Sequence, residues 1–537
     1  MNSTHVPTQL RRRRVALCLL ISLAFALAAY RFDYVAAQTQ TECPVRVTLL
    51  QVNDVYQFAP VDGGTRGGLA RVSTLRKKIL AESPHTLFLM AGDTISPSLE
   101  SNTRVNNVML QGRQMIEAWN AAGLDYATLG NHEFDFGPEV LLQRMGESKF
   151  KWLAANVIDK KTGKLFGETP EFIVREFDGV KIGMFGILLP ETTSTSRPGP
   201  NVDILDPCET AGRVIPKIRA AGAQVIVALT HLSMAEDKQL ARCSGVDVII
   251  GGHEHTLLES MAGRAPIFKM TADAREMGRI DLNIDKKTGK LESIDWKVIP
   301  VTSEYEDDPG FAPLNEKYGA LLKSLEQPVG RTDVPLDMKS ENVRTRETNM
   351  GNFIADAYRQ ATGADVALVN GGSIRADALI QPGVLTKRDV LSILPFNNKV
   401  LKIELTGATL RAALEHGVGS IGVESQPGRF PQVSGIRFSY DATRKAGERV
   451  TNVTVNGRPL IDRQKYTLAA TNYVIKDAGD GYTMFRDAKV VVGADQAPNE
   501  ADILQKAITS VRPIAPKVEG RVTRVDTPKD KRSCPEG

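Results

Sequence analysis

Short apolar runs alternate with segments of helical periodicity through the first half of the chain. Residues 45–52 and 86–90 are apolar runs of strand length, and the residues between them predict a helix over 68–82, with Leu69, Val72, Leu75 and Ile79 on one face. Four more strand-like runs follow, at residues 126–129, 181–187, 225–229 and 246–250. Strands that alternate with helices are typical of an α/β domain, in which polar residues at the strand ends form a site at one edge.

The pattern changes after residue 300. The acidic stretch 303–310 contains Asp-Asp-Pro-Gly, a turn signal, and residues 311–325 have the pattern of one helix. A second α/β segment follows, with a helix predicted at residues 349–362 and a strand at 365–370. We therefore predict an N-terminal domain at 44–302, a linker with a helix at 303–340, a C-terminal domain at 341–525 and a polar tail at 526–537.

The first 37 residues have the composition of a secretory signal peptide. Four arginines at 11–14 precede an apolar stretch of 16 residues, 15–30, and small residues at 35–37 offer a cleavage site. The alternative is a membrane anchor, but this stretch is shorter than the roughly 20 residues that span a bilayer. We expect residues 1–37 to be cleaved, with no membrane span after them and export to the periplasm or the extracellular space.

Removal of this leader changes the charge of the chain. The formal net charge is +4, and residues 1–37 hold five arginines and one aspartate, so 5 − 1 = 4 positive charges are lost with them. The remaining chain is close to neutral. Because nucleic-acid backbones are bound by clustered basic residues, a nucleic-acid polymer is not an expected partner.

Four cysteines remain after the leader, an even number in a chain that we expect to be exported, and they allow three pairings. We favour Cys43 with Cys534, because chain ends often lie close together. We also favour Cys208 with Cys243, because these two flank one strand–helix segment. Free buried thiols are the alternative.

Polar motifs rich in metal-binding residues follow five of the apolar runs. They are Asn53-Asp54, Gly92-Asp93-Thr94, Gly130-Asn131-His132-Glu133-Phe134-Asp135, Thr230-His231 and Gly252-His253-Glu254-His255. Four of the seven histidines of the chain lie in these motifs, which chance scattering does not explain. His253 and His255 are two residues apart, so their side chains point the same way in an extended segment.

These residue types match the needs of phosphoester hydrolysis. The reaction needs an activated water, charge neutralisation on the phosphoryl oxygens and a proton for the leaving group. Two metal ions roughly 3.5–4 Å apart supply the first two, and a positioned imidazole supplies the third. The candidate metal ligands are Asp54, Asp93, Asn131, His231, His253 and His255, and the candidate proton donor is His132, with Asp135 beside it. Such ligands suit Mn, Zn, Fe and Co alike.

The five motifs resemble those of the calcineurin-like metallophosphatases, and residues 45–525 as a whole resemble the two-domain 5′-nucleotidases. The resemblance implies an α/β protein with an N-terminal metallophosphatase β-sandwich flanked by helices and a separate C-terminal α/β substrate-binding domain. It implies that Asp93 bridges two divalent ions and that His132 protonates the leaving group, oriented by Asp135. It assigns Asp54 and His255 to one ion, and Asn131, His231 and His253 to the other.

The first motif departs from this family, which usually has Asp-x-His where Asp54-Val55-Tyr56 stands. At strand period Tyr56 shares a side with Asp54, so its phenol takes the place of an imidazole ligand. A phenol with an ordinary pKa near 10 binds a divalent ion poorly unless it is deprotonated. Three interpretations are open. Tyr56 ligates Fe(III) as a tyrosinate, as in the purple acid phosphatases of this superfamily; it leaves its ion one ligand short; or it packs at an inactive site.

The substrate-binding candidates lie in the second half of the chain. Gly371-Gly372-Ser373-Ile374-Arg375 follows a buried strand, and the resemblance implies that Arg375 binds the phosphate. Phe430 and Tyr482 match the positions of two aromatic residues that stack on the base in the family, with core packing as the alternative. Asp487 lies close to the position at which the family has a ribose-binding carboxylate. Arg411, Asn398 and Lys399 are further polar candidates without a ranking.

Together these features favour an exported dimetal phosphomonoesterase that releases a nucleoside and phosphate from nucleoside 5′-monophosphates. Cleavage of UDP-sugars or of 2′,3′-cyclic nucleotides in the same site is an alternative. A sulfur-oxidation hydrolase is a more distant enzyme alternative, which the proposed aromatic clamp disfavours. The non-enzyme alternative is a nucleotide-binding protein with a decayed first metal position.

Overall fold

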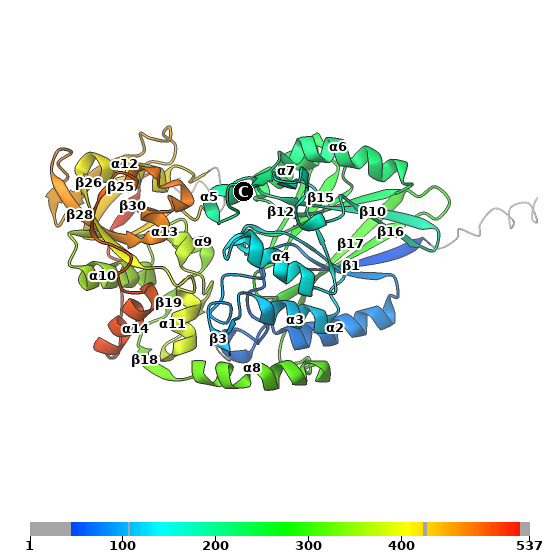
Figure 1. The fold of residues 1–537 in the computed structure, drawn as a ribbon, viewed down its shortest axis with the longest axis horizontal. Coiled ribbons are helices and arrows are strands. Elements are labelled where there is room, and N and C mark those ends of the chain that lie inside the picture. Colours follow the sequence, from blue (N-terminus) through cyan, green and yellow to red (C-terminus); the bar gives the residue numbers. More distant parts are fainter. Residues whose placement is uncertain (1–43, 106–107, 423–426, 527–537) are drawn as a thin grey trace, which may run out of the picture.

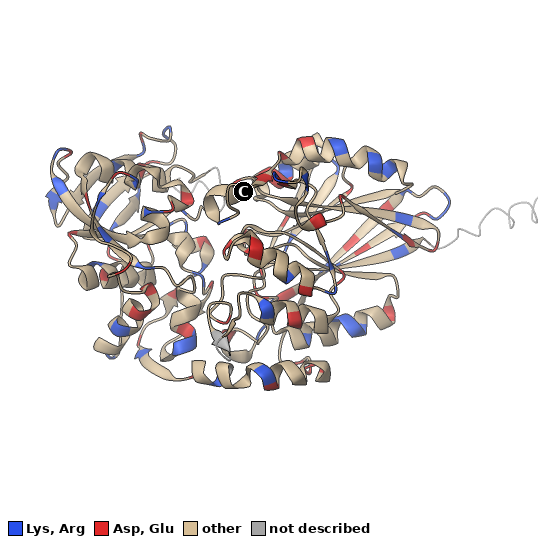
Figure 2. Cartoon of the chain, viewed as in Figure 1, with Lys and Arg blue, Asp and Glu red and all other residues tan. Residues whose placement is uncertain are grey.

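Two domains lie side by side in the computed structural model, which describes residues 44–105, 108–422 and 427–526 (Figure 1). The predicted signal peptide, Cys43, Cys534 and residues 527–537 of the predicted tail lie outside the described residues. Basic and acidic residues are interspersed along both domains (Figure 2), as expected for a chain of low net charge. No helix within the described ranges is long and apolar enough to cross a bilayer.

The N-terminal domain is a sandwich of two six-stranded sheets. The first has the order β17 (Leu291–Pro300), β16 (Glu276–Ile284), β1 (Val45–Val52), β2 (Thr86–Met90), β5 (Tyr126–Thr128), β6 (Lys151–Leu153). The second has the order β14 (Leu258–Ala262), β15 (Ala265–Lys269), β13 (Val248–Gly251), β12 (Val225–His231), β10 (Val180–Leu188), β9 (Ile173–Phe177). Strands β1, β2, β5 and β6 are parallel, as are β10, β12, β13 and β15, so the carboxyl ends within each set share one edge.

Burial on both faces explains why these strands read as continuous apolar runs. Alternate residues of β1 and β2, such as Val47 and Leu87, pack against residues of the second sheet in one cluster, and Leu50 and Phe88 pack in another cluster with the helices. Helices cover the outer faces; they are α2 (Leu69–Glu82), α3 (Arg113–Ala122), α4 (Pro138–Glu147), α6 (Pro207–Ala220) and α7 (Met234–Cys243). The α/β class and the predicted metallophosphatase sandwich are confirmed.

A disulfide joins the start of α6 to the end of α7. Cys208 and Cys243 are bonded, with 5.9 Å between their Cα atoms, which confirms this predicted pair. The other predicted pair involves residues outside the described part of the chain.

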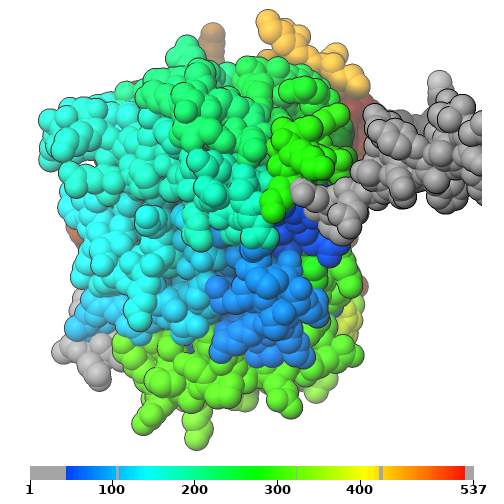
Figure 3. All heavy atoms as spheres, turned by 90° about the vertical axis from the view of Figure 1, so that its right-hand side faces the viewer, coloured from blue at the N-terminus to red at the C-terminus, as the bar shows by residue number. Residues whose placement is uncertain are grey.

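The predicted linker divides between the two domains. Helix α8 (Ala312–Leu325) packs on the N-terminal domain, where the Tyr318 ring lies 5.8 Å from that of Phe58 and the Tyr318 hydroxyl donates to Glu117 over 3.0 Å. It runs along the lower edge of the molecule in Figures 1 and 3. Strand β18 (Pro328–Thr332) already pairs with β22 (Gly383–Thr386) of the C-terminal domain, so the crossing between domains lies near residue 327.

The C-terminal domain has a five-stranded and a four-stranded sheet. The first has the order β24 (Pro431–Ser434), β20 (Val366–Asn370), β28 (Lys465–Thr471), β23 (Val400–Thr406), β29 (Lys489–Val492). The second has the order β27 (Arg458–Pro459), β26 (Val450–Val455), β25 (Ile436–Tyr440), β30 (Val522–Arg524). The main helices are α10 (Asn349–Thr362), α11 (Lys387–Ile393), α12 (Gly407–Val418) and α14 (Glu500–Ser510). The loop after β20 carries Arg375 toward the N-terminal domain, where it contacts Tyr56.

Candidate active site

The predicted metal ligands follow strands of both sheets of the sandwich. Each lies where a parallel strand ends, which brings loops from distant parts of the sequence together. Asp54 follows β1, Asp93 follows β2, Asn131 follows β5, His231 ends β12, and His253 and His255 follow β13.

The backbone at four of these residues is left-handed, a conformation that residues other than glycine rarely adopt. The φ angles are 53° at Asp54, 62° at Asp93, 88° at His253 and 58° at His255. Glycines allow the loops to approach one another: a Cβ on Gly92 would lie 2.4 Å from His231 Nδ1, and one on Gly130 would lie 2.2 Å from Asp93 Oδ1. Such strain is concentrated at functional sites, because the surrounding structure must stabilise it.

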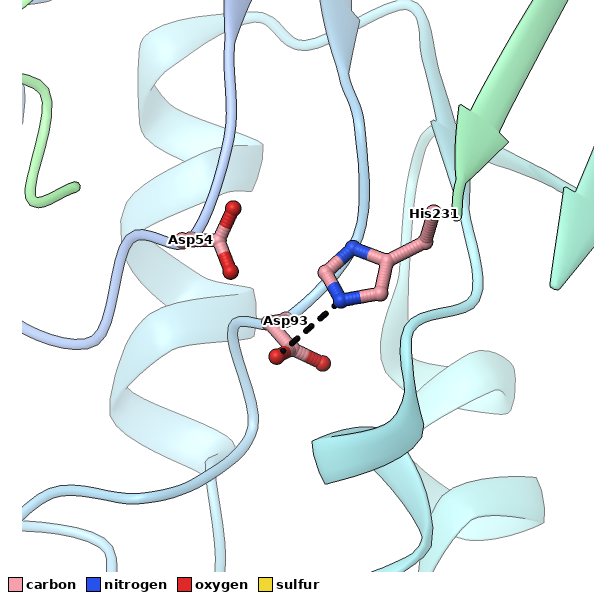
Figure 4. Close-up of side chains that lie close together, drawn as sticks. All are labelled: Asp54, Asp93 and His231. Atoms are coloured by element: carbon pink, nitrogen blue, oxygen red, sulfur yellow. Dashed lines mark ion pairs between the residues drawn. The ribbon is translucent and has the colours of Figure 1, made fainter. Parts of the chain in front are cut away.

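Asp54, Asp93 and His231 form a buried group of potential ligands whose donor atoms all lie within 4.8 Å of one another (Figure 4). The Nδ1 atom of His231 donates to the Ala91 carbonyl over 2.8 Å, which turns Nε2 toward Asp93, 3.2 Å away. His231 Nε2 is buried and its partner in this structure is Asp93, in an ion pair, whereas Asn131 Oδ1 is buried and has no hydrogen-bond partner among the described residues. Since buried polar atoms are normally paired, the Asn131 oxygen fits a metal ion as its missing partner.

A second group of donors surrounds the Tyr56 hydroxyl. Asp54 Oδ1 lies 3.1 Å from His255 Nε2. The Tyr56 oxygen lies 3.2 Å from Asp54 Oδ1, 3.2 Å from Asp93 Oδ2 and 2.9 Å from His255 Nε2. Tyr56 is therefore at the centre of the predicted metal site rather than in the apolar core.

The two carboxylates stay ionised in this buried site. Burial alone would raise the pKa of Asp93, but His231 and His132 lower it to about 2. Burial opposes protonation of His231, yet Asp93 and Asp54 raise its pKa to about 10. Burial and the charge of His231 lower the pKa of His253 well below its ordinary value. The negative charge of the two buried carboxylates must therefore be balanced by positive charge, which a proton on His231 or a metal ion can supply.

The predicted proton donor is held in the expected arrangement. His132 Nδ1 lies 2.8 Å from Asp135 Oδ2, and the hydroxyl of Ser196 donates to Asp135 Oδ1 over 2.7 Å. The Phe396 ring, from the C-terminal domain, lies 5.7 Å from the imidazole. Because the carboxylate accepts from Nδ1, the other ring nitrogen, Nε2, is not used in the contact with Asp135.

Two buried ionisable residues that were not predicted from the sequence hold the ligand loops. Glu133 accepts the backbone N–H groups of Asp93, Thr94, Ile95 and Gly130, which fixes the loop after β2 to the loop after β5. Lys269 Nζ donates to the carbonyls of Leu232 and Gly252 over 2.6 and 2.9 Å, and to Glu254 and Asp237 over 2.5 and 2.8 Å. Lys269 thus ties together the chain segments that carry His231, His253 and His255.

A cavity of about 440 Å³ lies between the domains and is lined by both. The N-terminal domain contributes to its lining Asp93, Asn131, His132, His253 and His255. The C-terminal domain contributes Arg344, Asn370, Arg375, Phe396 and Tyr473. Arg375 donates to the Tyr56 hydroxyl over 2.7 Å, and its guanidinium lies 5.1 Å from the centre of the Tyr56 ring. Arg344 was not among the residues predicted from the sequence. Its buried Nε, like that of Arg375, has no hydrogen-bond partner in the described part of the chain.

Comparisons with known proteins agree with this architecture. Residues 47–257 match the profile described as calcineurin-like phosphoesterase, and residues 328–487 match the 5′-nucleotidase C-terminal domain. The crystal structure of a 5′-nucleotidase precursor from Thermus thermophilus is 30% identical and superposes with a TM-score of 0.82, over 90% of this chain and 100% of that one. The chain belongs to the 5′-nucleotidase family. It is a metal-dependent phosphoric ester hydrolase.

Other similar proteins differ from this chain in length or share less of its sequence. A trifunctional nucleotide phosphoesterase of Bacillus subtilis is 33% identical over 90% of this chain, but the chain spans only 35% of that protein. The 5′-nucleotidase of Bos taurus is 28% identical over 89% of this chain and 91% of its own length. A sulfate thiohydrolase of Thermus thermophilus, 20% identical with a TM-score of 0.75, shows a shared fold.

One group of predicted substrate residues does not face the cavity of this 5′-nucleotidase family member. Phe430 and Tyr482 are fully buried in the C-terminal core, where the Tyr482 hydroxyl donates to the Arg429 carbonyl over 2.6 Å and its ring stacks on Phe485. Asp487 is exposed and also lies outside the cavity lining. Phe430 and Tyr482 therefore do not form the expected aromatic clamp in this structure, because both rings pack in the core.

Other aromatic and polar residues line the cavity instead. The aromatic side chains in its wall are Phe136, Phe396 and Tyr473. Two of the unranked polar candidates, Asn398 and Lys399, also line it, whereas Arg411 forms an ion pair with Asp462 on the surface.

Proposed function

We propose that this protein hydrolyses nucleoside 5′-monophosphates to nucleoside and phosphate with two divalent metal ions. The observation that carries the proposal is a single cavity in which metal-type ligands and His132 from one domain face Arg344 and Arg375 from the other. A phosphate monoester is a small dianion joined to an alkoxide leaving group. The cavity offers cations for the first and a proton donor for the second.

The two arginines are suited to hold the phosphate. Burial and the neighbouring charge of Arg375 lower the pKa of Arg344 to about 10, so it remains cationic near neutral pH. Two buried guanidinium groups with unpaired Nε atoms gain charge-assisted hydrogen bonds when an anion enters. Arg375 already reaches Tyr56 beside the metal ligands, so the bound phosphate would lie between the two domains.

The residues of the N-terminal domain account for the chemistry. Asp93, Asn131, His231 and His253 would hold one ion, and Asp54, Asp93 and His255 the other. Bound divalent ions supply charge neutralisation and activate water. His132 donates a proton from Nε2 to the leaving oxygen, and Asp135 and Ser196 keep its ring in place. Glu133 and Lys269 maintain the ligand loops.

We propose further that the protein works outside the cytoplasm. The signal-like composition of residues 1–37 supports export, and the Cys208–Cys243 disulfide fits an oxidising compartment. A second candidate activity, on other nucleotide phosphoesters in the same site, is supported by the similarity to the trifunctional nucleotide phosphoesterase.

A phosphate-release screen on the purified mature protein tests the proposal. The substrates are AMP, UMP, UDP-glucose, 2′,3′-cyclic AMP and ATP, each with Mn, Zn, Fe or Co. We expect the highest kcat/KM for a nucleoside 5′-monophosphate. A preference for UDP-glucose or the cyclic nucleotide would support the second candidate, and no turnover of any of the five would reject both.

A further inference from the structure

An aromatic side chain of the C-terminal domain lies against the proposed proton donor of the N-terminal domain. Phe396 is half-buried in the wall of the cavity. The centre of its ring lies 5.7 Å from that of the His132 imidazole, and the two planes meet at 34°. The guanidinium of Arg375 lies 5.8 Å from the centre of the same ring. Phe396 therefore contacts both the group that would donate the proton and the group that would bind the phosphate.

The backbone on either side of Phe396 is fixed, and both domains take part. The carbonyl of Pro395 accepts a hydrogen bond from Asn102 Nδ2 of the N-terminal domain over 2.9 Å. The N–H of Asn398 donates to the buried carboxyl group of Glu500 over 3.1 Å. Because these hydrogen bonds flank Phe396 closely, its ring is held at a defined place in the cavity wall.

The His132 imidazole needs a contact of this kind. Its hydrogen bond to Asp135, 2.8 Å at Nδ1, leaves the ring free to tilt about that point. A tilt moves Nε2, which lies 4.0 Å from the nearest oxygen of Asp93 and is not fixed by it. The Tyr56 ring meets the imidazole nearly at right angles, with 6.4 Å between the ring centres. Phe396 is closer and lies at a shallower angle, so it restricts the tilt more directly.

We propose that Phe396 is a positioning residue for His132, whose ring it holds so that Nε2 points at the leaving oxygen. The contact with Arg375 places the Phe396 ring beside the bound phosphate, because the leaving oxygen and the oxygens bound by an arginine belong to the same phosphoryl group. The inference rests on the function proposed above and deepens it. Proton donation by the N-terminal domain depends on a residue of the C-terminal domain, in addition to the phosphate contacts that this domain supplies.

Turnover of three substrates by variants of Phe396 tests the proposal. AMP and glycerol 3-phosphate release alkoxides, which need a proton, whereas 4-nitrophenyl phosphate does not. Phe396→Leu keeps an apolar side chain but removes the ring. Its kcat on both alkyl phosphates should fall at least about tenfold, because misplacement of a reacting group by 1 Å costs on the order of 100-fold. Its kcat on 4-nitrophenyl phosphate should fall less than about threefold, and Phe396→Tyr, which keeps the ring, should stay within about threefold of wild type on all three.

A double substitution separates positioning from a general structural effect. If Phe396 acts through His132, Phe396→Leu should change kcat on the alkyl phosphates less than about threefold when His132 is already alanine. Phe353→Leu is the matched control and should leave the ratio of the kcat values unchanged. Phe353 is also half-buried in the C-terminal domain, but it packs on the core of that domain and lies outside the cavity lining.

Two results would overturn the assignment. One is an equal loss on the alkyl phosphates and on 4-nitrophenyl phosphate in Phe396→Leu, whose melting temperature shows whether it is folded. The other is a loss on AMP that is as large in the His132→Ala protein as in the wild type. Wild-type protein that hydrolyses glycerol 3-phosphate but not AMP would instead reject the proposed nucleotide substrate, and the ratio of glycerol 3-phosphate to 4-nitrophenyl phosphate turnover would still decide the role of Phe396.

Discussion

Replacement of His132 by alanine should slow the release of a nucleoside far more than the release of a nitrophenol. The alkoxide of a nucleoside is a poor leaving group and needs a proton, whereas nitrophenolate leaves without one. Loss of a general acid costs about 10²–10⁴-fold in kcat, equivalent to roughly 3–5 kcal/mol of transition-state stabilisation. We expect a loss in this range on AMP and a loss of less than about tenfold on 4-nitrophenyl phosphate.

The position of His132 allows an effect on proton donation to be separated from an effect on metal binding. The His132 imidazole is held by Asp135 over 2.8 Å and lies 4.0 Å from the nearest oxygen of Asp93, beyond hydrogen-bond distance. Metal content should therefore stay at the wild-type value. Asp135→Asn should give a smaller loss on AMP, because the ring remains but is oriented less firmly. His85→Ala, with its imidazole 3.7 Å from Asp178 and outside the cavity, is the matched control. Equal losses on AMP and 4-nitrophenyl phosphate would refute the proton-donor role.

Four further single substitutions probe other buried charged residues. Arg344→Ala and Arg375→Ala should each raise the inhibition constant for inorganic phosphate by about 10–150-fold, the value of one charge-assisted hydrogen bond, and unchanged inhibition would exclude a phosphate contact. Lys269→Met leaves Asp237 and Glu254 without their buried cation and should cost about 3–5 kcal/mol of stability in denaturant unfolding; the triple variant that also has Asp237→Asn and Glu254→Gln should recover much of it. Burial raises the pKa of Glu500 to about 7, so folding favours its protonated form: stability is fullest below the ordinary carboxyl pKa and falls as the pH rises through about 7. Glu500→Gln should flatten the melting temperature between about pH 5 and pH 8, and an unchanged profile would contradict this origin.

The N-terminal site was largely predictable because its signals are local. Each ligand follows an apolar run directly, and parallel strands must bring their ends to one edge, so the order of the motifs indicates a common site. The predicted helix at 349–362 coincides with α10. Strand β12 extends to His231, two residues beyond the predicted apolar run. The candidate ligand His231 is polar but is still part of the strand, so the apolar pattern ends before the strand does.

The substrate end was less predictable because side-chain direction depends on tertiary packing. Phe430 and Tyr482 are aromatic residues in loops rich in glycine, and the sequence alone does not show whether such rings face a core or a cavity. Arg344 lies in an ordinary polar stretch of the sequence. Only the structure shows that its Nε is buried without a hydrogen-bond partner among the described residues. Lys269 did leave a signal, a lysine that ends an apolar strand, but its four contacts come from segments up to 37 residues away.

The most direct test of the account is product analysis after metal removal and return. Purified mature protein is treated with a chelator, divided, and supplied with Mn, Zn, Fe or Co before AMP is added. We expect no turnover without metal, and equal amounts of adenosine and phosphate once a suitable ion is restored. Phosphate release that survives complete metal removal, or no release with any of the four ions, would contradict it.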